Sequence, residues 1–337
     1  MTLFAQDPGR GTTTLSQILG VRRALGCDHF FGCYAYATAS GFRTFELAVG
    51  KSFWSDTNSR WLLGIDYGRT HPWALRAIAK RARTEVRIFD GRFVVNRANF
   101  VPRRDYHAKA AIMKNSVSRE QGAVIGSGNF SQNGLERSVE AGVAIIGRNK
   151  DEIQQHIEPA SAVFEALWKQ ACPWENIAET YEERWKALPR LRDAAHASGA
   201  TGPMTGFWIE AGHVTKNRGE GKPGNQIFAP AGFRRYFGLK SAKAGSTLIG
   251  QIVFDTDIGS RVIKNYREND NKMEKLTLPM PEQHGFGVYD GKVLIFEKRR
   301  RGFHLSALEA SDFELAYGHR IINAEAMIGG RRFGEYV

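Results

Sequence analysis

Short apolar runs alternate with an amphipathic stretch in the first half of the chain. Runs of the kind that form buried strands lie at residues 61–65, 86–89, 106–113, 123–125 and 138–146, and residues 72–83 have the apolar spacing of a helix. Strands that alternate with helices are typical of a layered α/β domain. We therefore expect an α/β fold for this half of the protein.

The pattern changes after residue 203, where short apolar runs are separated by glycine-rich segments. These runs lie at residues 207–210, 247–254, 276–278, 286–289, 293–297 and 313–315. Asp290-Gly291 separates two of the runs, and this dipeptide favours a two-residue hairpin turn because it tolerates positive φ. The second half is therefore expected to be an all-β barrel or sandwich.

The segment between the two halves has helical periodicity and an acidic composition. Residues 150–172 carry apolar side chains close to helical spacing, and Pro173 ends that stretch because proline disfavours helical geometry in the residue before it. Residues 174–195 form a second, acidic helical stretch, followed by a run of small and helix-breaking residues. We expect a first domain at 1–173, an acidic helical linker at 174–200 and a second domain at 201–337. The linker helix lies either against a basic surface or in solvent.

Basic residues outnumber acidic ones by 47 to 35, which gives a formal net charge of +12. Residues 1–150 hold 22 basic and 11 acidic residues, residues 151–200 hold 5 and 9, and residues 201–337 hold 20 and 15. Two basic regions thus flank an acidic connector. This distribution indicates a polyanionic partner, with nucleic acid favoured over an anionic membrane surface.

Composition also excludes several classes of protein. Hydrophobic residues make up 42% and charged residues 24%, so the chain can bury a core and is not of the disordered type. No apolar run approaches the roughly 18–20 residues that cross a bilayer, and no secretory signal is visible. The 3 cysteines are too few for a disulfide framework. We expect a soluble cytoplasmic protein that does not contact a membrane.

Residues 106–140 concentrate side chains that suit phosphate chemistry. His107 and Lys109 are two apart on a predicted strand and so share a face, where an imidazole and an ammonium are costly to bury unless an anion lies between them. The Gly126-Ser127-Gly128-Asn129 turn offers backbone N–H groups, a hydroxyl and an amide to phosphate oxygens. Glu140 on the next predicted strand is placed to accept a hydrogen bond from the imidazole and to fix its tautomer.

These residues resemble the signature of the phospholipase D superfamily, H-x-K followed by G-S-x-N. A Glu eleven residues after the Asn resembles the nuclease branch of that superfamily. The resemblance covers roughly residues 25–170. It implies His107 as nucleophile, Lys109 and Asn129 as phosphate binders, Ser127 as a further donor and Glu140 as the partner of His107.

The mechanism implied by this resemblance uses no metal and no other cofactor. One histidine attacks phosphorus to give a covalent phosphohistidine, and a second histidine protonates the leaving oxygen. The chain has a single H-x-K, so we expect a homodimer through the N-terminal domain in which each chain supplies His107 to one composite site. Lys114 stands where the superfamily usually has a structural Asp, which weakens a lipase interpretation more than a nuclease one.

Two basic, polar segments of the second half are expected to be loops that contact DNA. They span residues 211–243 and 257–275. Flexible loops that carry Arg, Lys and Asn can contact phosphates and base edges together. The predicted DNA-binding residues are Lys216, Asn217, Arg218, Lys222, Asn225, Arg261, Lys264, Asn265 and Arg267. A pair of solvated turns is the alternative.

A phospholipase D-like nuclease domain followed by a small β-barrel resembles the BfiI-like restriction endonucleases, which fuse that nuclease to a B3-like pseudobarrel. The resemblance implies a restriction endonuclease that hydrolyses double-stranded DNA at a specific sequence. Some relatives work with a separate ATP-dependent translocase subunit, through which alone ATP would enter. Two alternatives stay open: a nonspecific phospholipase D-family nuclease or phosphodiesterase, and a DNA-binding protein whose nuclease core is inactive.

Overall fold

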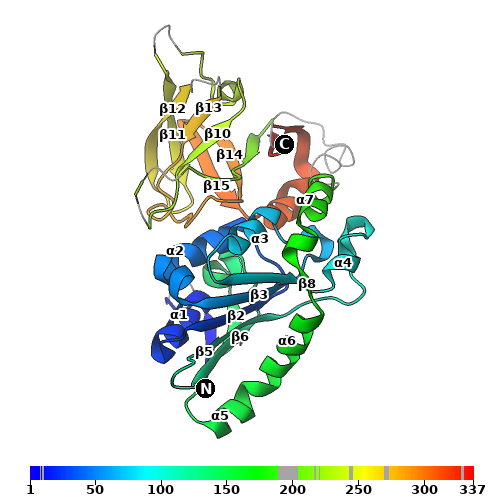
Figure 1. Cartoon of the computed structure of the whole chain (residues 1–337). Helices are drawn as coiled ribbons and strands as arrows, with labels where there is room; N and C mark the ends of the chain where they lie inside the picture. The colour runs from blue at the N-terminus through cyan, green and yellow to red at the C-terminus, as the bar shows by residue number, and fades with distance from the viewer. Residues whose placement is uncertain are drawn as a thin grey trace. The chain divides into compact units, whose positions relative to one another are not determined.

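The computed structural model describes residues 1–7, 9, 11–188, 204–215, 218–219, 221–242, 246–268, 273–327 and 330–337. The chain divides into two compact units, Met1–Leu188 and Pro189–Val337. Figure 1 draws the first in blue to green and the second in yellow-green to red. Each unit has hydrophobic core clusters of its own.

The first unit is built on an eight-stranded mixed sheet in the order β1-β7-β6-β5-β2-β3-β4-β8. Its strands are β1 (Thr2–Gln6), β2 (His29–Tyr34), β3 (Asn58–Leu63), β4 (Thr84–Ile88), β5 (Lys109–Lys114), β6 (Gln121–Gly126), β7 (Glu140–Gly147) and β8 (Cys172–Pro173). β2, β3 and β4 are parallel, and the other neighbours are antiparallel. Parallel neighbours need crossover connections, which α2 (Ala39–Asp56) and α3 (Pro72–Ala79) supply.

Helices cover both faces of this sheet (Figure 1). α1 (Thr14–Leu25) joins α2 and α3 on one face, and α5 (Lys150–His156) and α6 (Glu158–Gln170) lie on the other. On β2, Phe30 and Tyr34 therefore belong to the first core, whereas Phe31 and Cys33 pack with Trp168 of α6. Burial on both faces explains the continuous apolar runs in these strands. The shorter elements are η2 (Asp66–Gly68), α4 (Gly91–Val94), η3 (Ala98–Phe100), η4 (Asn133–Arg137) and η5 (Trp174–Asn176).

The α/β character predicted for this half is confirmed, with two corrections to its elements. β5 begins at Lys109 rather than at residue 106, so His107 lies just before the strand. The helix expected over residues 150–172 is two helices, because Pro159 lies in the first turn of α6 and has no N–H to donate to the preceding turn. The sequence patterns did not predict α1, α2, β1 or β2.

The helix α7 (Ala178–Lys186) packs into the core of the first unit. Tyr181 is fully buried, and its hydroxyl donates to the carbonyl of Thr70 at 2.7 Å. The indole Nε1 of Trp185 donates to the carbonyl of Gly68 at 2.9 Å. The first unit therefore extends past the predicted boundary at residue 173, and residues 189–200 of the predicted linker lie outside the described residues.

The second unit contains a nine-stranded sheet in the order β10-β13-β12-β11-β15-β14-β9-β17-β16. Its strands are β9 (Gly206–Glu210), β10 (Gln226–Ala229), β11 (Leu248–Thr256), β12 (Arg261–Glu268), β13 (Glu274–Thr277), β14 (Val293–Arg299), β15 (Gly302–Leu308), β16 (Ile321–Ala326) and β17 (Arg332–Tyr336). η6 (Phe233–Phe237), α9 (Ala310–Tyr317) and η7 (Gly318–Arg320) complete its described elements. The sheet curls around an aromatic core that includes Phe207, Phe237 and Phe296 (Figure 1). The β-rich character expected here is confirmed.

Three expectations for the second unit were wrong. Residues 286–289 form no strand, and Gly291 instead turns the chain with φ 72° while its N–H bonds the carbonyl of Gly212. Residues 313–315 lie in the helix α9. The helical repeat brings Phe313 and Tyr317, four residues apart, onto one face, where their rings stack and stabilise the helix. The expected loop 257–275 contains the strand β12 and the start of β13, and Tyr266 of β12 points into the core.

Candidate active site

His107 and Lys109 meet at the end of β5. Lys109 is the first residue of the strand, and its Nζ lies 2.8 Å from Nδ1 of His107 and 2.9 Å from the His107 carbonyl oxygen. His107 is exposed and Lys109 is partly buried. The contact leaves the Nε2 atom of His107 without a hydrogen bond to any described residue, so this nitrogen is the one available to a ligand.

The strand that carries this pair is held at the centre of the sheet. β5 pairs with β2 on one side, where Lys109 lies opposite Tyr34, and with β6 on the other. The next four residues of β5, 110–113, are apolar and buried between the two helical layers. Polar side chains are thus confined to the strand end, where they reach solvent without crossing the core.

The turn after β6 places Ser127 beside Glu140, the first residue of β7. Ser127 N–H donates to the carbonyl of Ala141 at 3.0 Å, and the N–H of Ala141 donates to Ser127 Oγ at 3.1 Å. The hydroxyl of Ser127 in turn donates to the carboxylate of Glu140. In this structure, then, Ser127 holds Glu140.

Close backbone packing explains the glycines of this turn. A Cβ atom on Gly128 would lie 2.3 Å from the carbonyl oxygen of Gly134, and one on Gly126 would lie 2.7 Å from that of Ala141. Next to these contacts, the Oδ1 atom of Asn129 is buried and has no hydrogen-bond partner among the residues that the structure describes. A buried polar atom of this kind needs a partner, which a bound ligand or water can supply.

Two charged residues, Glu140 and Arg69, act electrostatically on Lys109. Burial lowers the pKa of Lys109, the nearby charge of Glu140 raises it, and the charge of Arg69 lowers it further, with a net decrease. Glu140 is therefore close enough to act on Lys109. Arg69, which lies in the loop after β3, is close enough as well.

The loop at residues 66–70 is a part of the site that the sequence did not reveal. The carboxylate of Asp66 accepts the backbone N–H of Tyr106 at 3.0 Å, and the Tyr67 hydroxyl donates to Asp105 at 3.2 Å. Asp66 is only 8% exposed, and burial raises its pKa to about 6. The loop is therefore fastened to the residues directly before His107. The signal for it was available: polar residues directly after a buried strand of a parallel set lie at the edge where sites form.

Two features differ from what the superfamily resemblance implies. No hydrogen bond joins Glu140 to His107 among the described residues, since Glu140 accepts from Ser127 and His107 contacts Lys109. The second difference is Lys114, which stands where the superfamily usually has an Asp. It is the last residue of β5 and lies about 17 Å from the start of that strand, at roughly 3.3 Å per residue, so position 114 is far from the candidate site. Asp28 supplies a carboxylate at that end, where it accepts the N–H of Ser116 at 2.9 Å. The turn after β5 is thus fastened without an Asp at position 114.

Three predicted DNA-binding residues of the second unit bond to the protein itself. Arg218 pairs with Glu282 at 2.6 Å and also donates to the carbonyl of Pro223 at 3.1 Å. Asn225 is buried, and its Nδ2 donates to the carbonyl of Leu278 at 3.0 Å. Arg261 donates to the Arg301 carbonyl. These contacts assign the three side chains internal roles.

The remaining predicted residues are distributed over different surfaces. Lys222 and Arg267 are exposed, and Asn265 accepts from Gln251 at 3.2 Å on the outer side of β12. Lys264 lies opposite Ile252, a core residue, and so on the other side of that strand. Lys216 and Asn217 lie outside the described residues.

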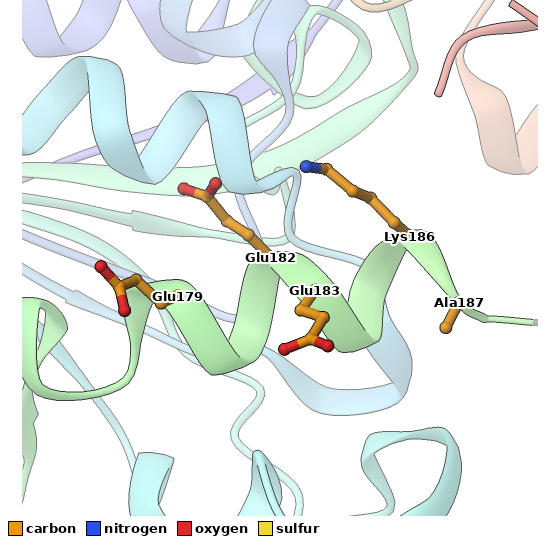
Figure 2. A pocket seen from close by; sticks show the side chains of 5 residues that line it. All are labelled: Glu179, Glu182, Glu183, Lys186 and Ala187. Atoms are coloured by element: carbon orange, nitrogen blue, oxygen red, sulfur yellow. The ribbon is translucent and has the colours of Figure 1, made fainter. Parts of the chain in front are cut away.

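An open pocket on α7 has the wrong charge for a phosphodiester. Figure 2 shows its lining side chains, Glu179, Glu182, Glu183, Lys186 and Ala187. Glu182 pairs with Arg76 of α3. Three carboxylates around one opening repel an anionic substrate, so the pocket is not the phosphate site.

No group of three or more His, Cys, Asp or Glu side chains that could hold a metal ion occurs in the described part of the chain. Among the same residues, no helix is both long and apolar enough to cross a membrane. Independence of metal remains a prediction.

The chain is similar to solved structures that include a member of the phospholipase D family. That member is Nuc from Salmonella typhimurium, with 14% sequence identity and a TM-score of 0.34 over 51% of this chain and 97% of that one. NucT from Helicobacter pylori has 16% identity, with the same TM-score of 0.34 and the same coverage of 51% and 97%. No protein-family model and no curated protein matches the chain. At this level of identity and superposition, the side chains of the site carry the functional conclusion.

Proposed function

We propose that the protein is a metal-independent endonuclease that hydrolyses phosphodiester bonds of double-stranded DNA through a phosphohistidine. The observation that carries this proposal is the contact between His107 and Lys109 at the end of β5, with Glu140 within electrostatic reach of Lys109. The proposed nucleophile, the cation and the carboxylate thus lie at the same end of the sheet, at the starts of β5 and β7. The buried, unpartnered amide oxygen of Asn129 marks the adjacent turn as a place for a ligand.

Substrate binding is expected to change the tautomer of His107. While protonated Lys109 donates to Nδ1, the ring proton lies on Nε2, and that nitrogen has no lone pair for attack. A phosphate that enters the site draws the ammonium group onto its own oxygens. Nδ1 can then carry the proton and donate to a carboxylate, for which Glu140 is the candidate. Occupancy of the site and activation of the nucleophile are coupled in this way.

The reaction proceeds in two displacements. In the first, Nε2 of His107 forms a bond to phosphorus, the bond from phosphorus to the leaving oxygen breaks, and His107 of a second copy donates a proton to that oxygen. In the second, water attacks phosphorus, the phosphorus–nitrogen bond breaks, and the second histidine takes a proton from the water. Lys109 and Asn129 offset the negative charge on the phosphoryl oxygens in both steps.

The need for two histidines makes a homodimer part of the proposal. Each chain contains one H-x-K, so a composite site needs the N-terminal units of two chains. The neighbourhood of Glu140 offers apolar surface for such contact, since Val139 is 86% exposed and Leu3 on the edge strand β1 is 82% exposed.

The second unit is proposed to read the DNA sequence, as in a restriction endonuclease with a B3-like domain. Support comes from its separate core and from the basic excess over residues 201–337, where Lys222 and Arg267 are exposed. A separate ATP-dependent translocase subunit remains part of this finer proposal.

A nonspecific nuclease is the second candidate, and one observation favours it. Arg218, Asn225 and Arg261 each donate hydrogen bonds to groups of the protein itself, although Arg261 is exposed. A DNA-binding protein with an inactive core is disfavoured, because all five predicted site residues lie at the same end of the sheet.

Plasmid DNA incubated with the protein in excess EDTA tests the function. We expect cleavage by the wild type and a loss of at least about 1,000-fold in the His107→Ala variant, because the nucleophile is gone. His156→Ala is the matched control, since this histidine is exposed on α5. It should cut like the wild type.

The products separate the candidates. Discrete fragments indicate sequence-specific cleavage, and a smear indicates the nonspecific nuclease. Cleavage that needs Mg²⁺, or that survives in His107→Ala, would refute the proposed mechanism.

A further inference from the structure

Three arginines of the first unit lie over aromatic rings in the segment of the chain that precedes His107. We call Arg97, Arg103 and Arg104, with the rings of Phe89 and Phe93, the arginine ridge. The guanidinium of Arg104 lies 5.3 Å from the centre of the Phe89 ring. Those of Arg103 and Arg97 lie 4.3 and 5.2 Å from the centre of Phe93. Rings in these positions orient the guanidinium groups and limit their motion.

The arginine ridge contacts Tyr106, the residue directly before His107. Phe89 stacks on Tyr106 with ring centres 4.9 Å apart and planes at 19°. Tyr106 precedes His107, and its backbone N–H is held by Asp66 at 3.0 Å. Arg104 thus lies on a ring that packs against the side chain of Tyr106, the residue that precedes His107.

Most of the charge of the ridge is not neutralised. Arg97 and Arg104 are exposed and make no ion pair with any residue that the structure describes, whereas Arg103 pairs with Asp90. The backbone under Arg97 is fixed from α7, since Arg184 donates to the carbonyls of Val95 at 2.7 Å and Arg97 at 3.1 Å. A positive surface on a fixed backbone suits a ligand with regularly spaced anions.

We propose that the arginine ridge binds backbone phosphates of the DNA strand that runs into the active site. This inference rests on the proposed function and adds where the substrate lies. Guanidinium groups bind phosphate oxygens in a bidentate manner, whatever the base sequence. The catalytic unit then holds DNA through its own contacts, independently of the second unit. The rings of Phe89 and Phe93 lie under guanidinium groups, which argues against insertion into a lipid surface.

The test compares two triple variants of the full-length chain, both carrying His107→Ala so that DNA is bound but not cut. One adds Arg97→Ala and Arg104→Ala. The matched control adds Arg23→Ala and Arg119→Ala, two exposed arginines near the opposite end of the sheet, where Asn115 of the β5–β6 turn bonds the end of α1. Both variants lose the same charge.

Binding of a short fluorescent duplex is measured by anisotropy over a series of salt concentrations. Each lost phosphate contact lowers the slope of log K against log salt by about 0.9. We expect the ridge variant to lose about 1.8 in slope and the control to keep the slope of the parent. A third variant, Phe93→Leu, keeps every charge and should weaken binding by a smaller factor, because it removes the support alone.

Three outcomes would overturn the proposal. These are an unchanged slope in the ridge variant, an equal loss in the control, or an unchanged affinity for DNA with a lost affinity for vesicles of anionic lipid. Thermal melting of each variant checks that it is folded. Because binding is measured in a variant that cannot cut, the result does not depend on the outcome of the EDTA cleavage test.

Discussion

His107 and Lys109 of the first unit lie at the start of β5 with their side-chain nitrogens in contact, and Nε2 of the histidine has no hydrogen-bond partner among the described residues. In the second unit, Arg218, Asn225 and Arg261 direct their polar atoms to groups of the protein itself. Both sets were predicted from the sequence, and both lie in basic regions. Their surroundings nevertheless differ in kind.

The difference lies in what each prediction used. The first prediction used different polar residue types at a fixed spacing. The packing of a hydrophobic core does not require such a combination. The second used the density of one charge sign in a glycine-rich segment. A fold also needs arginines and amides to satisfy buried carbonyls, so charge density alone does not separate ligand binding from structure.

Replacing Lys109 with Met tests the first side of this comparison and has the largest expected effect. The variant keeps the length of the side chain but loses the cation that we propose to bind the phosphoryl oxygens. We expect kcat for DNA cleavage to fall by about 10² to 10³-fold, as when one preorganised donor is removed. Single-turnover cleavage measures it.

Lys222→Met is the matched control in the second unit, where the same charge is lost from an exposed lysine. It should leave the single-turnover rate at saturating protein unchanged. An equal loss of rate in both variants would mean that the two units do not divide chemistry from binding.

Much of the fold was predictable because strands that are buried on both faces have continuous apolar runs in the sequence. β5 carries an unbroken apolar run, and the polar residues at its start were found next to that run, whereas its neighbour β2 was not predicted. β12 shows the limit of that approach: its interior side bears Tyr266 but also Lys264, so the expected alternation is hidden and the segment resembled a loop. Phe313 was assigned to a strand because Phe313-Glu314-Leu315, with one polar residue between two apolar ones, is too short to distinguish the strand period from the helical one.

The candidate site could be predicted where its residues are close in sequence and not where packing brings distant residues together. His107, Lys109 and Glu140 follow from spacing. Asp66 and Arg69 lie about forty residues upstream in the numbering of the chain, and only the pairing of β2 with β3 and β5 brings them near. The bond from Ser127 to Glu140 depends on rotamers that spacing does not determine.

A buried carboxylate in the second unit allows the independence of the two units to be tested. Glu274 is 1% exposed and accepts from Tyr266 Oη at 2.7 Å and from the N–H groups of Gly232 at 2.8 Å and Arg234 at 2.7 Å. Glu274→Ala leaves these donors unpaired, and we expect the free energy of unfolding of this unit to fall by about 3 kcal/mol. Differential scanning calorimetry should show its transition at lower temperature, with that of the first unit unmoved.

Glu297→Ala is the control for that measurement, because Glu297 forms a surface pair with Arg299 at 2.9 Å. Its effect should stay within about 0.5 kcal/mol. If Glu274→Ala moves both transitions together, the units do not unfold independently, and the comparison between them loses its basis.

The smallest expected effect separates structural from DNA-binding arginines within the second unit. Arg218 is 15% exposed in its side chain and bonds Glu282, whose pKa it lowers, whereas Arg267 is exposed on β12 and makes no ion pair with the residues the structure describes. Arg218→Ala should lower the free energy of unfolding by about 1 kcal/mol and leave the salt dependence of DNA binding unchanged. Arg267→Ala should do the reverse, lowering the slope of log K against log salt by about 0.9 without a change in stability. Chemical denaturation and anisotropy titrations of the two variants measure both quantities. A lower slope for Arg218→Ala would show that this arginine leaves Glu282 for DNA, and the second unit would then resemble the first.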